Sequence, residues 1–295
     1  MILVTGAAGK TGQAVIRTLT AKGEKVRALV HRPEQTRTVE ELGAQEVVVG
    51  DMRLQATMDR AARGAQAIYH ICPNVHPDEI AIGQTVIAAA RSAGVEHFVY
   101  HSVLHPQTEA MPHHWQKLRI EEHLFESGLP RTILQPTAYM QNLLAHWGQI
   151  VEQGTYSVPY AVETRLSLVD LEDVAEAAAL VLTEPGHVGA TYELVGTEGM
   201  SQTEVAAILS QQLGCPVCAQ VVSLEAWAQR AGAAGLGDYQ VETLLKMFRY
   251  YERYGFWGSP RVLGWLLGRP PTTLVDFVER IVRPDGSSDC LEVGD

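Results

Sequence analysis

Short apolar runs alternate with amphipathic segments along the first half of the chain. The runs fall at residues 2–4, 25–30, 46–49, 66–71, 96–101 and 131–134. Between them, apolar positions at helical spacing predict helices that follow residue 9 and cover 33–42, 55–63, 77–93 and 112–127. Apolar runs without polar alternation are typical of strands covered on both faces. The pattern therefore predicts an α/β fold with a doubly wound parallel sheet.

The pattern changes after Pro136. Helical spacing predicts helices at 139–152, 170–183, 223–231, 240–254 and 273–282, and another that begins with the capping box Ser201-Gln-Thr-Glu204. Residues 154–159 predict turns, and 190–195 predict a further strand. We therefore expect a sheet domain at 1–136, a smaller helix-rich portion at 137–283 that is interwoven with the sheet, and a flexible tail at 284–295.

A glycine-rich turn joins the first strand to the first helix, with glycine at every third position. Free backbone N–H groups and the positive end of the dipole at a helix start bind anions, and glycine lets a diphosphate approach closely. The context predicts a dinucleotide-binding Rossmann domain, and its turn residues are Gly6, Ala8, Gly9, Lys10, Thr11 and Gly12. A tight turn without a ligand is the alternative. An ATP-binding P-loop is excluded, because it needs glycine where Val4 stands.

Composition limits the classes of function. The 295 residues include 46% hydrophobic and 19% charged residues, which is typical of a globular protein. The formal net charge of −11 disfavours nucleic acid and anionic membranes as partners. The first strand begins at once, and no apolar stretch reaches about 18 residues, so we expect a cytoplasmic protein without a signal peptide or a membrane span.

The 4 cysteines are too few for a disulfide framework in a chain of this length. Cys215 and Cys218 have C-x-x-C spacing, but no second pair or histidine pair completes a zinc site. We interpret them as small apolar residues that enter a strand, and a redox or metal role is the alternative.

The residues after the second and third strands favour NADP over NAD. NAD sites usually place an acidic residue after the second strand to bind the ribose 2′-hydroxyl, but this sequence continues with His31 and Arg32. Arg32 is suited to a 2′-phosphate through a charge-assisted contact, and Lys10 adds positive charge on the same side. Asp51 and Met52, after the third strand, are expected beside the adenine. Solvated surface cations and an ordinary turn are the alternatives.

Polar and small residues also follow the fourth and fifth strands. Ile71, Cys72 and Pro73 are expected to face the central riboses of the cofactor. We interpret Cys72 as a packed residue and not as a nucleophile, because none of its neighbours predicts a lowered thiol pKa. Ser102 follows the fifth strand, where its hydroxyl is placed to meet a substrate carbonyl.

Histidines are frequent in residues 97–123, and aromatic residues are frequent in 248–257. The histidines have no H-E-x-x-H or comparable ligand spacing, so no metal site is predicted. The aromatic residues either wall a substrate cleft or form an ordinary core in the C-terminal portion. They are Phe248, Tyr250, Tyr251, Tyr254, Phe256 and Trp257.

Four segments together resemble one family. They are Thr5–Gly12, His113–Lys117 (HHWQK), Gln135–Asn142 (QPTAYMQN) and Leu168–Ala175 (LVDLEDVA). The chain is similar, over most of its length, to the NmrA-like branch of the atypical short-chain dehydrogenases. The resemblance implies an extended Rossmann fold, NADP(H) as cofactor, and a substrate cleft between the sheet and the C-terminal portion. Members include NADPH-dependent quinone and azo-type reductases, plant phenolic reductases, and proteins that only sense the NADP redox state.

The Tyr-x-x-x-Lys pair of typical short-chain dehydrogenases is incomplete here. Lys117 is present, and His113 holds the tyrosine position on the same face of the helix. By the resemblance, Lys117 hydrogen-bonds the nicotinamide ribose. His113 is a candidate proton donor, because an ordinary histidine pKa of about 6.5 suits neutral pH. A surface histidine beside His114 is the alternative.

By the same resemblance, Pro136, Thr137 and Tyr139 flank the nicotinamide and leave one face of the ring open. Tyr139 is placed to stack on the substrate or to pack in the core. The absent tyrosine acid favours a quinone-like acceptor, since a hydroquinone anion is more stable than an alkoxide, or no turnover at all. We therefore expect an NADPH-dependent reductase of a small quinone-like or aromatic acceptor. The alternative is a non-catalytic NADP(H)-binding redox sensor that acts through a protein partner, and the oligomeric state is left open.

Overall fold

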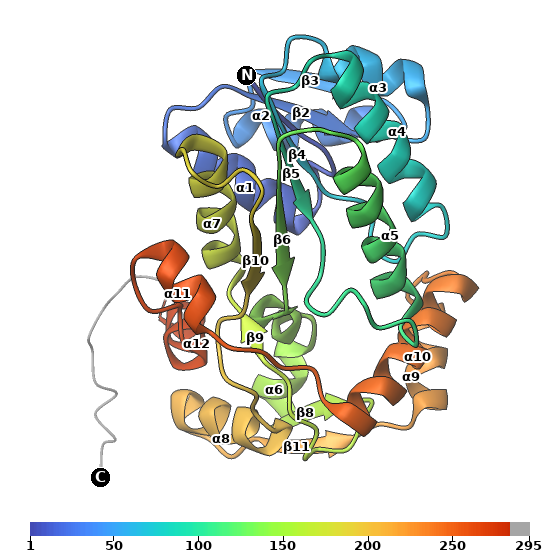
Figure 1. Cartoon of the computed structure of the whole chain (residues 1–295). Helices are drawn as coiled ribbons and strands as arrows, with labels where there is room; N and C mark the ends of the chain where they lie inside the picture. Colours follow the sequence, from blue (N-terminus) through green and yellow to red (C-terminus); the bar gives the residue numbers. More distant parts are fainter. Residues whose placement is uncertain (284–295) are drawn as a thin grey trace.

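A parallel sheet of 7 strands lies at the centre of the computed structural model, which describes residues 1–283 (Figure 1). Its order is β10-β6-β5-β4-β1-β2-β3, and every neighbouring pair is parallel. The strands are β1 (Ile2–Val4), β2 (Val26–Val30), β3 (Glu46–Val49), β4 (Ala67–His70), β5 (His97–His101), β6 (Arg131–Pro136) and β10 (Thr191–Leu194). The predicted doubly wound sheet is confirmed, whereas the tail predicted at 284–295 lies outside the described residues.

Helices cover both faces of the sheet. One layer holds α1 (Lys10–Ala21), α7 (Leu171–Thr183) and α11 (Arg261–Leu267), and the other holds α3 (Gln55–Ala62), α4 (Glu79–Ser92) and α5 (Pro112–Glu126). In β1, Ile2 and Val4 pack into the first layer and Leu3 packs into the second. Burial on both faces is the physical reason for the unbroken apolar runs of these strands.

The C-terminal portion adds its own elements around a third apolar cluster, seen in the lower half of Figure 1. Two short parallel pairs form, β7 (Ala138–Tyr139) with β9 (Leu168–Val169) and β8 (Thr155–Val158) with β11 (Cys218–Val221). Its helical elements are η2 (Met140–His146), α6 (Trp147–Gln153), α8 (Gln202–Leu213), α9 (Leu224–Ala233), α10 (Asp238–Tyr254) and α12 (Leu274–Val282). Because β10 pairs with β6, this portion also completes the central sheet.

Three local predictions differ from the structure. The helix predicted at 139–152 is divided, because Tyr139 pairs in β7 and a 3-10 segment precedes α6. Residues 154–159 hold β8 as well as a turn, since Tyr156 and Val158 alternate into the core after Gly154 ends α6 in the left-handed region. The helix predicted at 33–42 begins as a 3-10 turn, η1 (Pro33–Gln35), before α2 (Thr36–Glu41). Helix α11 was not predicted, because a helix of two turns is too short to show a clear period.

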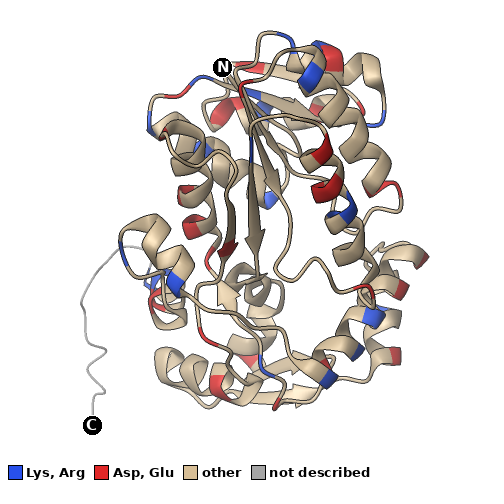
Figure 2. Ribbon diagram, viewed as in Figure 1, with Lys and Arg blue, Asp and Glu red and all other residues tan. Residues whose placement is uncertain are grey.

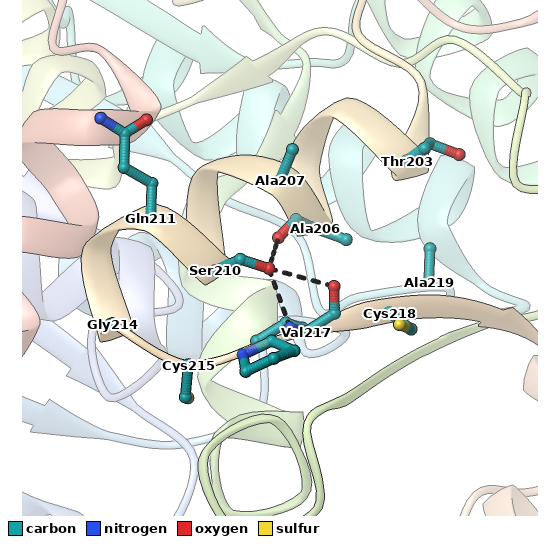
Figure 3. A pocket seen from close by; sticks show the side chains of 11 residues that line it. Thr203, Ala206, Ala207, Ser210, Gln211, Gly214, Cys215, Val217, Cys218 and Ala219 are labelled. Carbon is teal, nitrogen blue, oxygen red and sulfur yellow. Dashed lines mark hydrogen bonds between the residues drawn. The ribbon is translucent and has the colours of Figure 1, made fainter.

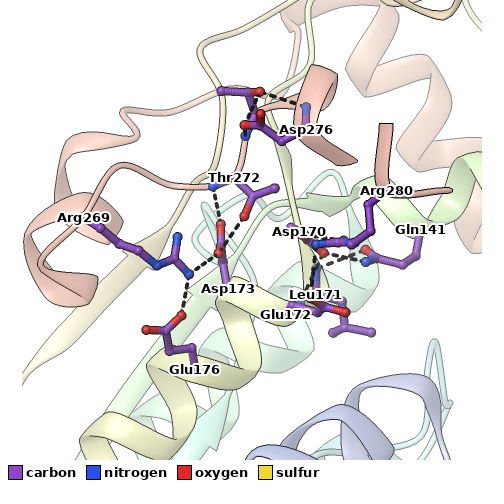
Figure 4. A network of polar contacts seen from close by, with 11 residues as sticks. Gln141, Asp170, Leu171, Glu172, Asp173, Glu176, Arg269, Thr272, Asp276 and Arg280 are labelled. Atoms are coloured by element: carbon purple, nitrogen blue, oxygen red, sulfur yellow. Dashed lines mark hydrogen bonds and ion pairs between the residues drawn. The ribbon is translucent and has the colours of Figure 1, made fainter. Parts of the chain in front are cut away.

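Charged residues lie mainly on the outer helices and loops (Figure 2). Four of them, together with Thr272, form what we call the C-terminal clamp: Asp170, Asp173, Arg269 and Arg280 (Figure 4). Arg280 bonds Asp170 at 2.6 Å and Arg269 bonds Asp173 at 2.7 Å, while the Thr272 N–H donates to Asp173 at 2.7 Å. The clamp therefore fastens the last described segment to the start of α7. Within residues 1–283, the structure has no helix with the length and apolarity needed to cross a membrane.

Candidate active site

Two glycines of the turn between β1 and α1 are required by the backbone. Gly6 has φ of 58°, in the left-handed region, and a Cβ there would lie 2.9 Å from the carbonyl oxygen of Ile71. A Cβ on Gly12 would overlap the Gly6 carbonyl oxygen and the backbone of Ala7. Helix α1 can therefore pack directly on the turn only because Gly6 and Gly12 have no side chains.

The start of α1 offers donors for an anion. Gly9 is the N-cap residue and supplies no side-chain cap. The N–H groups of the first helical turn, from Lys10 to Gly12, have no acceptor within the helix. Together with the helix dipole, these donors fit the diphosphate of a dinucleotide. A methyl group at Gly9 would stand in this opening, 3.3 Å from the Gly6 carbonyl oxygen.

A cleft of about 880 Å³ extends from this turn past the carboxyl ends of the sheet strands into the C-terminal portion. It brings together most of the site residues predicted from sequence. Those that line it are Gly6, Ala8, Gly9, Lys10, Thr11, Gly12, Met52, Ile71, Cys72, Pro73, Ser102, His113, Lys117, Pro136, Thr137 and Tyr139. Arg32 and Asp51 do not line it.

The cleft carries no negative side chain at the end where the adenosine is expected. Asp51 instead forms an ion pair with Arg53 at 2.7 Å. The Gln35 side-chain oxygen accepts the N–H groups of His31 and Arg32, each at 3.0 Å, and Arg32 itself is exposed. Throughout the described chain, no aspartate or glutamate lines the cleft. A 2′-phosphate would therefore meet no like charge there.

Lys117 on α5 is held by a carboxylate on the neighbouring helix α4. Its Nζ donates to Glu79 Oε1 at 2.5 Å, and the Glu79 side chain is completely buried. Burial alone would lower the pKa of Lys117, but the Glu79 charge outweighs it and raises the pKa above its ordinary value. Lys117 is thus a fixed, charged ammonium group at the cleft, and an ammonium has further hydrogens to donate.

His113 does not have the ordinary pKa that the sequence suggested. Burial, reinforced by the charge of Lys117, lowers the pKa of His113 to about 4. At neutral pH the ring is therefore neutral, so the expected role as an imidazolium donor loses its basis. The surface alternative is also wrong, because His113 and His114 are both buried, with ring centroids 4.6 Å apart.

Ser102 and Cys72 are both buried beside the cleft. The Ser102 hydroxyl donates to Glu121 Oε1 at 2.5 Å, so the hydrogen expected to reach a substrate carbonyl is already bonded. Gln135 also donates to Glu121, at 2.9 Å, and burial raises the pKa of this carboxyl. Cys72 is buried in the apolar cluster of the second helix layer, as expected of a packed residue, and this burial raises the pKa of its thiol.

The far end of the cleft is apolar and aromatic. Phe248, Tyr251 and Phe256 line it, and Tyr251 stacks on Phe256 with ring centroids 4.8 Å apart. Trp227 joins them, edge-on to Phe248 at 4.7 Å. Tyr254 and Trp257 do not line the cleft and are 57% and 56% exposed, while Tyr250 packs against Tyr254. Half of the six aromatic residues in 248–257 thus form part of the cleft wall.

Sequence reasoning missed three polar groups at this site. Glu79 was not distinguished, because a single carboxylate on a predicted helix usually faces solvent. His101 ends β5 and lines the cleft, and its place at a strand end, just before Ser102, was the available signal. Tyr69, inside β4, hydrogen-bonds His101 at 2.7 Å, and no pattern in the sequence marks it.

A second, open groove lies beside Cys215 and Cys218 and shares no lining residue with the cleft (Figure 3). Its floor is fixed by Ser210, which donates to the Ala206 carbonyl and accepts the Val217 N–H, both at 2.8 Å. Cys218 begins β11, as the sequence predicted. Across residues 1–283, no three His, Cys, Asp or Glu side chains gather in a metal-binding cluster.

The chain is similar to known proteins over nearly its whole length. A model of the NmrA-like family matches residues 1–277. The chain is 30% identical over 281 residues to the NAD(P)H azoreductase of Xenophilus azovorans, which covers 95% of this chain and 97% of that protein. The NADPH-dependent quinone oxidoreductase of Escherichia coli, solved with NADPH, superposes with a TM-score of 0.83 at 29% identity over 96% of this chain and 100% of that one. The Citrobacter sp. triphenylmethane reductase, solved with NADP(H), gives 0.83 at 28% identity over 95% and 99%.

Proposed function

The chain belongs to the NmrA-like family, as its motifs predicted, and we propose that it is an NADPH-dependent reductase of quinone-like or other aromatic acceptors. One observation carries the proposal. A single cleft joins the anion site at the start of α1 to an aromatic end, and no carboxylate of the described chain lines it. Relatives that are similar over nearly the whole chain are named as reductases of azo, quinone and triphenylmethane compounds, and two of them were solved with NADPH or NADP(H).

The roles of individual residues follow from their places in the cleft. When bound, NADPH supplies a hydride, and the chain supplies binding and orientation. The first turn of α1 binds the diphosphate, and Lys117, fixed by Glu79, donates to the nicotinamide ribose. Pro136 and Thr137 flank the ring, and the aromatic end stacks on the acceptor and excludes water. These placements of residues are part of the proposal.

The test is NADPH oxidation by the purified chain with a benzoquinone, a naphthoquinone, an azo dye and a triphenylmethane dye. We expect turnover with at least one acceptor, and a higher kcat/KM with NADPH than with NADH. Calorimetry measures NADPH binding separately. If NADPH binds but no acceptor is reduced above the enzyme-free rate, the reductase proposal is wrong and the sensor hypothesis takes its place.

Two glycine variants provide a matched control. Gly9 has an ordinary φ of −75°, so Gly9→Ala folds but places a methyl group in the anion site. Loss of one charge-assisted hydrogen bond costs about 1.5–3 kcal/mol, which weakens NADPH binding by about tenfold to about 150-fold. Gly232 in α9 has no atom within 4 Å of an added Cβ, so Gly232→Ala should bind NADPH normally.

The proposal requires only a small-molecule partner besides NADPH. The cytoplasmic location, the lack of nucleic-acid binding and the division of the chain near residue 136 remain predictions.

A further inference from the structure

Three aromatic side chains connect the core of the sheet to the cleft. Tyr69 in β4 is completely buried, and its hydroxyl lies 2.7 Å from His101 Nδ1. On the other side of the imidazole, His101 Nε2 lies 2.8 Å from the Tyr139 hydroxyl. The Thr11 hydroxyl reaches the same Tyr139 oxygen at 3.4 Å, and Tyr139 lines the cleft.

The burial of this chain of groups fixes the direction of its hydrogen bonds. Burial lowers the pKa of His101 to about 3, so its ring is neutral and has one donor and one acceptor nitrogen. Burial raises the pKa of Tyr69, which therefore keeps its hydrogen. His101 Nδ1 is the hydrogen-bond partner of that hydroxyl within residues 1–283, so Tyr69 donates to Nδ1.

This tautomer of His101 determines the hydrogen bonds of the Tyr139 hydroxyl. With Nδ1 accepting, the ring hydrogen is on Nε2, and Nε2 donates to the Tyr139 oxygen. Thr11 donates to the same oxygen. The hydrogen of Tyr139 thus has an acceptor in neither neighbour and is available to an acceptor in the cleft, which this side chain lines.

We propose that the Tyr139 hydroxyl is the proton donor to the reduced acceptor, with His101 and Tyr69 as positioning residues. This inference rests on the proposed function. The acceptor gains a hydride from NADPH and a proton from Tyr139: the tyrosine O–H bond breaks, and an O–H or N–H bond forms on the acceptor. His101 and Thr11 hydrogen-bond the resulting phenolate, which regains a proton from solvent once the product has left the cleft. Tyr139 in β7 thereby supplies the proton that, in typical short-chain dehydrogenases, comes from a tyrosine at the position of His113 in α5.

The assignment predicts which acceptors the cleft reduces. A quinone gives a stable anion and needs little acid, whereas an azo bond or a conjugated ketone gives a basic anion that must be protonated as it forms. General acid catalysis typically contributes about 10²–10⁴-fold. The donor therefore extends the acceptor class from quinones to azo compounds and conjugated ketones.

Kinetics with Tyr139→Phe test the donor directly. We expect kcat to fall about 10²–10⁴-fold with an azo dye or a conjugated ketone, and about tenfold or less with a benzoquinone. NADPH affinity should be unchanged, and the solvent deuterium isotope effect on kcat should disappear. Tyr192→Phe is the matched control, since Tyr192 also bonds a histidine, His187 at 2.9 Å, but lies outside the cleft. Equal losses with all acceptors, or none, overturn the inference.

Imidazole nitrogen NMR of the protein without cofactor tests the arrangement independently of activity. We expect His101 to be neutral at neutral pH with its hydrogen on Nε2, assigned by the signal that His101→Gln removes. Tyr69→Phe should allow the other tautomer, and His101→Gln, whose amide keeps a donor near Tyr139, should retain more azo-dye activity than His101→Leu. A hydrogen on Nδ1 in the native protein overturns the inference. If the native protein binds NADPH but reduces no acceptor, the proposed function fails first and the proton donor with it.

Discussion

Breaking the ion pair between Glu79 and Lys117 from one side should destabilise the protein severely. The Glu79 side chain is completely buried, that of Lys117 is 15% exposed, and their atoms are 2.5 Å apart. Glu79→Leu leaves the Lys117 ammonium group without its partner, and Lys117→Met leaves the Glu79 carboxylate without its partner. A buried charge that loses its partner typically costs about 3–5 kcal/mol of unfolding free energy.

The double variant Glu79→Leu/Lys117→Met should recover most of this loss. Apolar replacement of a buried pair is often neutral, or stabilising by about 1–4 kcal/mol. We expect a neutral or stabilising outcome for this pair, because Glu79 Oε2 is buried without a hydrogen-bond partner in the described chain and its desolvation is therefore not compensated. The two single losses should therefore be strongly non-additive, with a coupling energy of about 3 kcal/mol or more.

Urea denaturation of the four proteins at neutral pH, followed by circular dichroism, measures this coupling. The exposed pair Lys246–Glu242 on α10, at 2.9 Å, is the control, and either single change there should cost about 0.5 kcal/mol or less. Single variants at Glu79 and Lys117 that lose no more than the control, or losses that simply add in the double variant, would refute the reasoning.

Two further predictions concern acid stability and cofactor choice. Burial lowers the pKa of His70, His101 and His113 to about 3, 3 and 4. The unfolded chain takes up these protons near pH 6.5 but the folded chain does not, so their stabilising contribution is complete above about pH 6.5 and is lost as the pH falls toward about 4, by about 1.4 kcal/mol per pH unit for each histidine. Urea denaturation across this range should show the slope, and His101→Gln should reduce it by one histidine's share; an unchanged slope contradicts the assignment. Arg32→Ala should lower the ratio of kcat/KM for NADPH over NADH by about tenfold to about a hundredfold, because Arg32 is exposed and has no ion pair within residues 1–283. The same ratio in Arg32→Ala as in Arg37→Ala, which breaks an exposed surface pair, would exclude Arg32 as the selector.

The parts of the fold with a strong sequence period were predictable. Strands such as Ile2–Val4 are apolar because both faces are covered, and Gly6 and Gly12 make backbone contacts that any side chain would block. Strand β8 was not predicted, because Gly154 and Pro159 make its segment resemble a turn, and α11 is too brief for a helical period to stand out. A segment with mixed signals, 139–152, was assigned a single helix because its strand pairing depends on distant Leu168 and Val169.

Site residues that belong to a local sequence motif could be predicted. Contacts between residues far apart in the sequence could not. The turn glycines and Lys117 follow from motifs. The partner of Lys117 is 38 residues away on another helix, and Tyr69 and Tyr139 meet His101 from two separate strands. The lowered pKa of His113 likewise depends on burial, which the local sequence does not express.

The C-terminal clamp makes the two sides of the molecule unequal in the contacts that join them. On one side it joins α12 to α7, the helix that packs against α1 and hence against the diphosphate site. On the opposite side, α5 and α10 face each other with a hydrogen bond of 3.0 Å from Gln116 to Tyr239 (Figure 1). The two portions are therefore joined by ion pairs to buried carboxylates on the clamp side and by a neutral hydrogen bond on the α5–α10 side, so we expect the α5–α10 side to be the weaker junction.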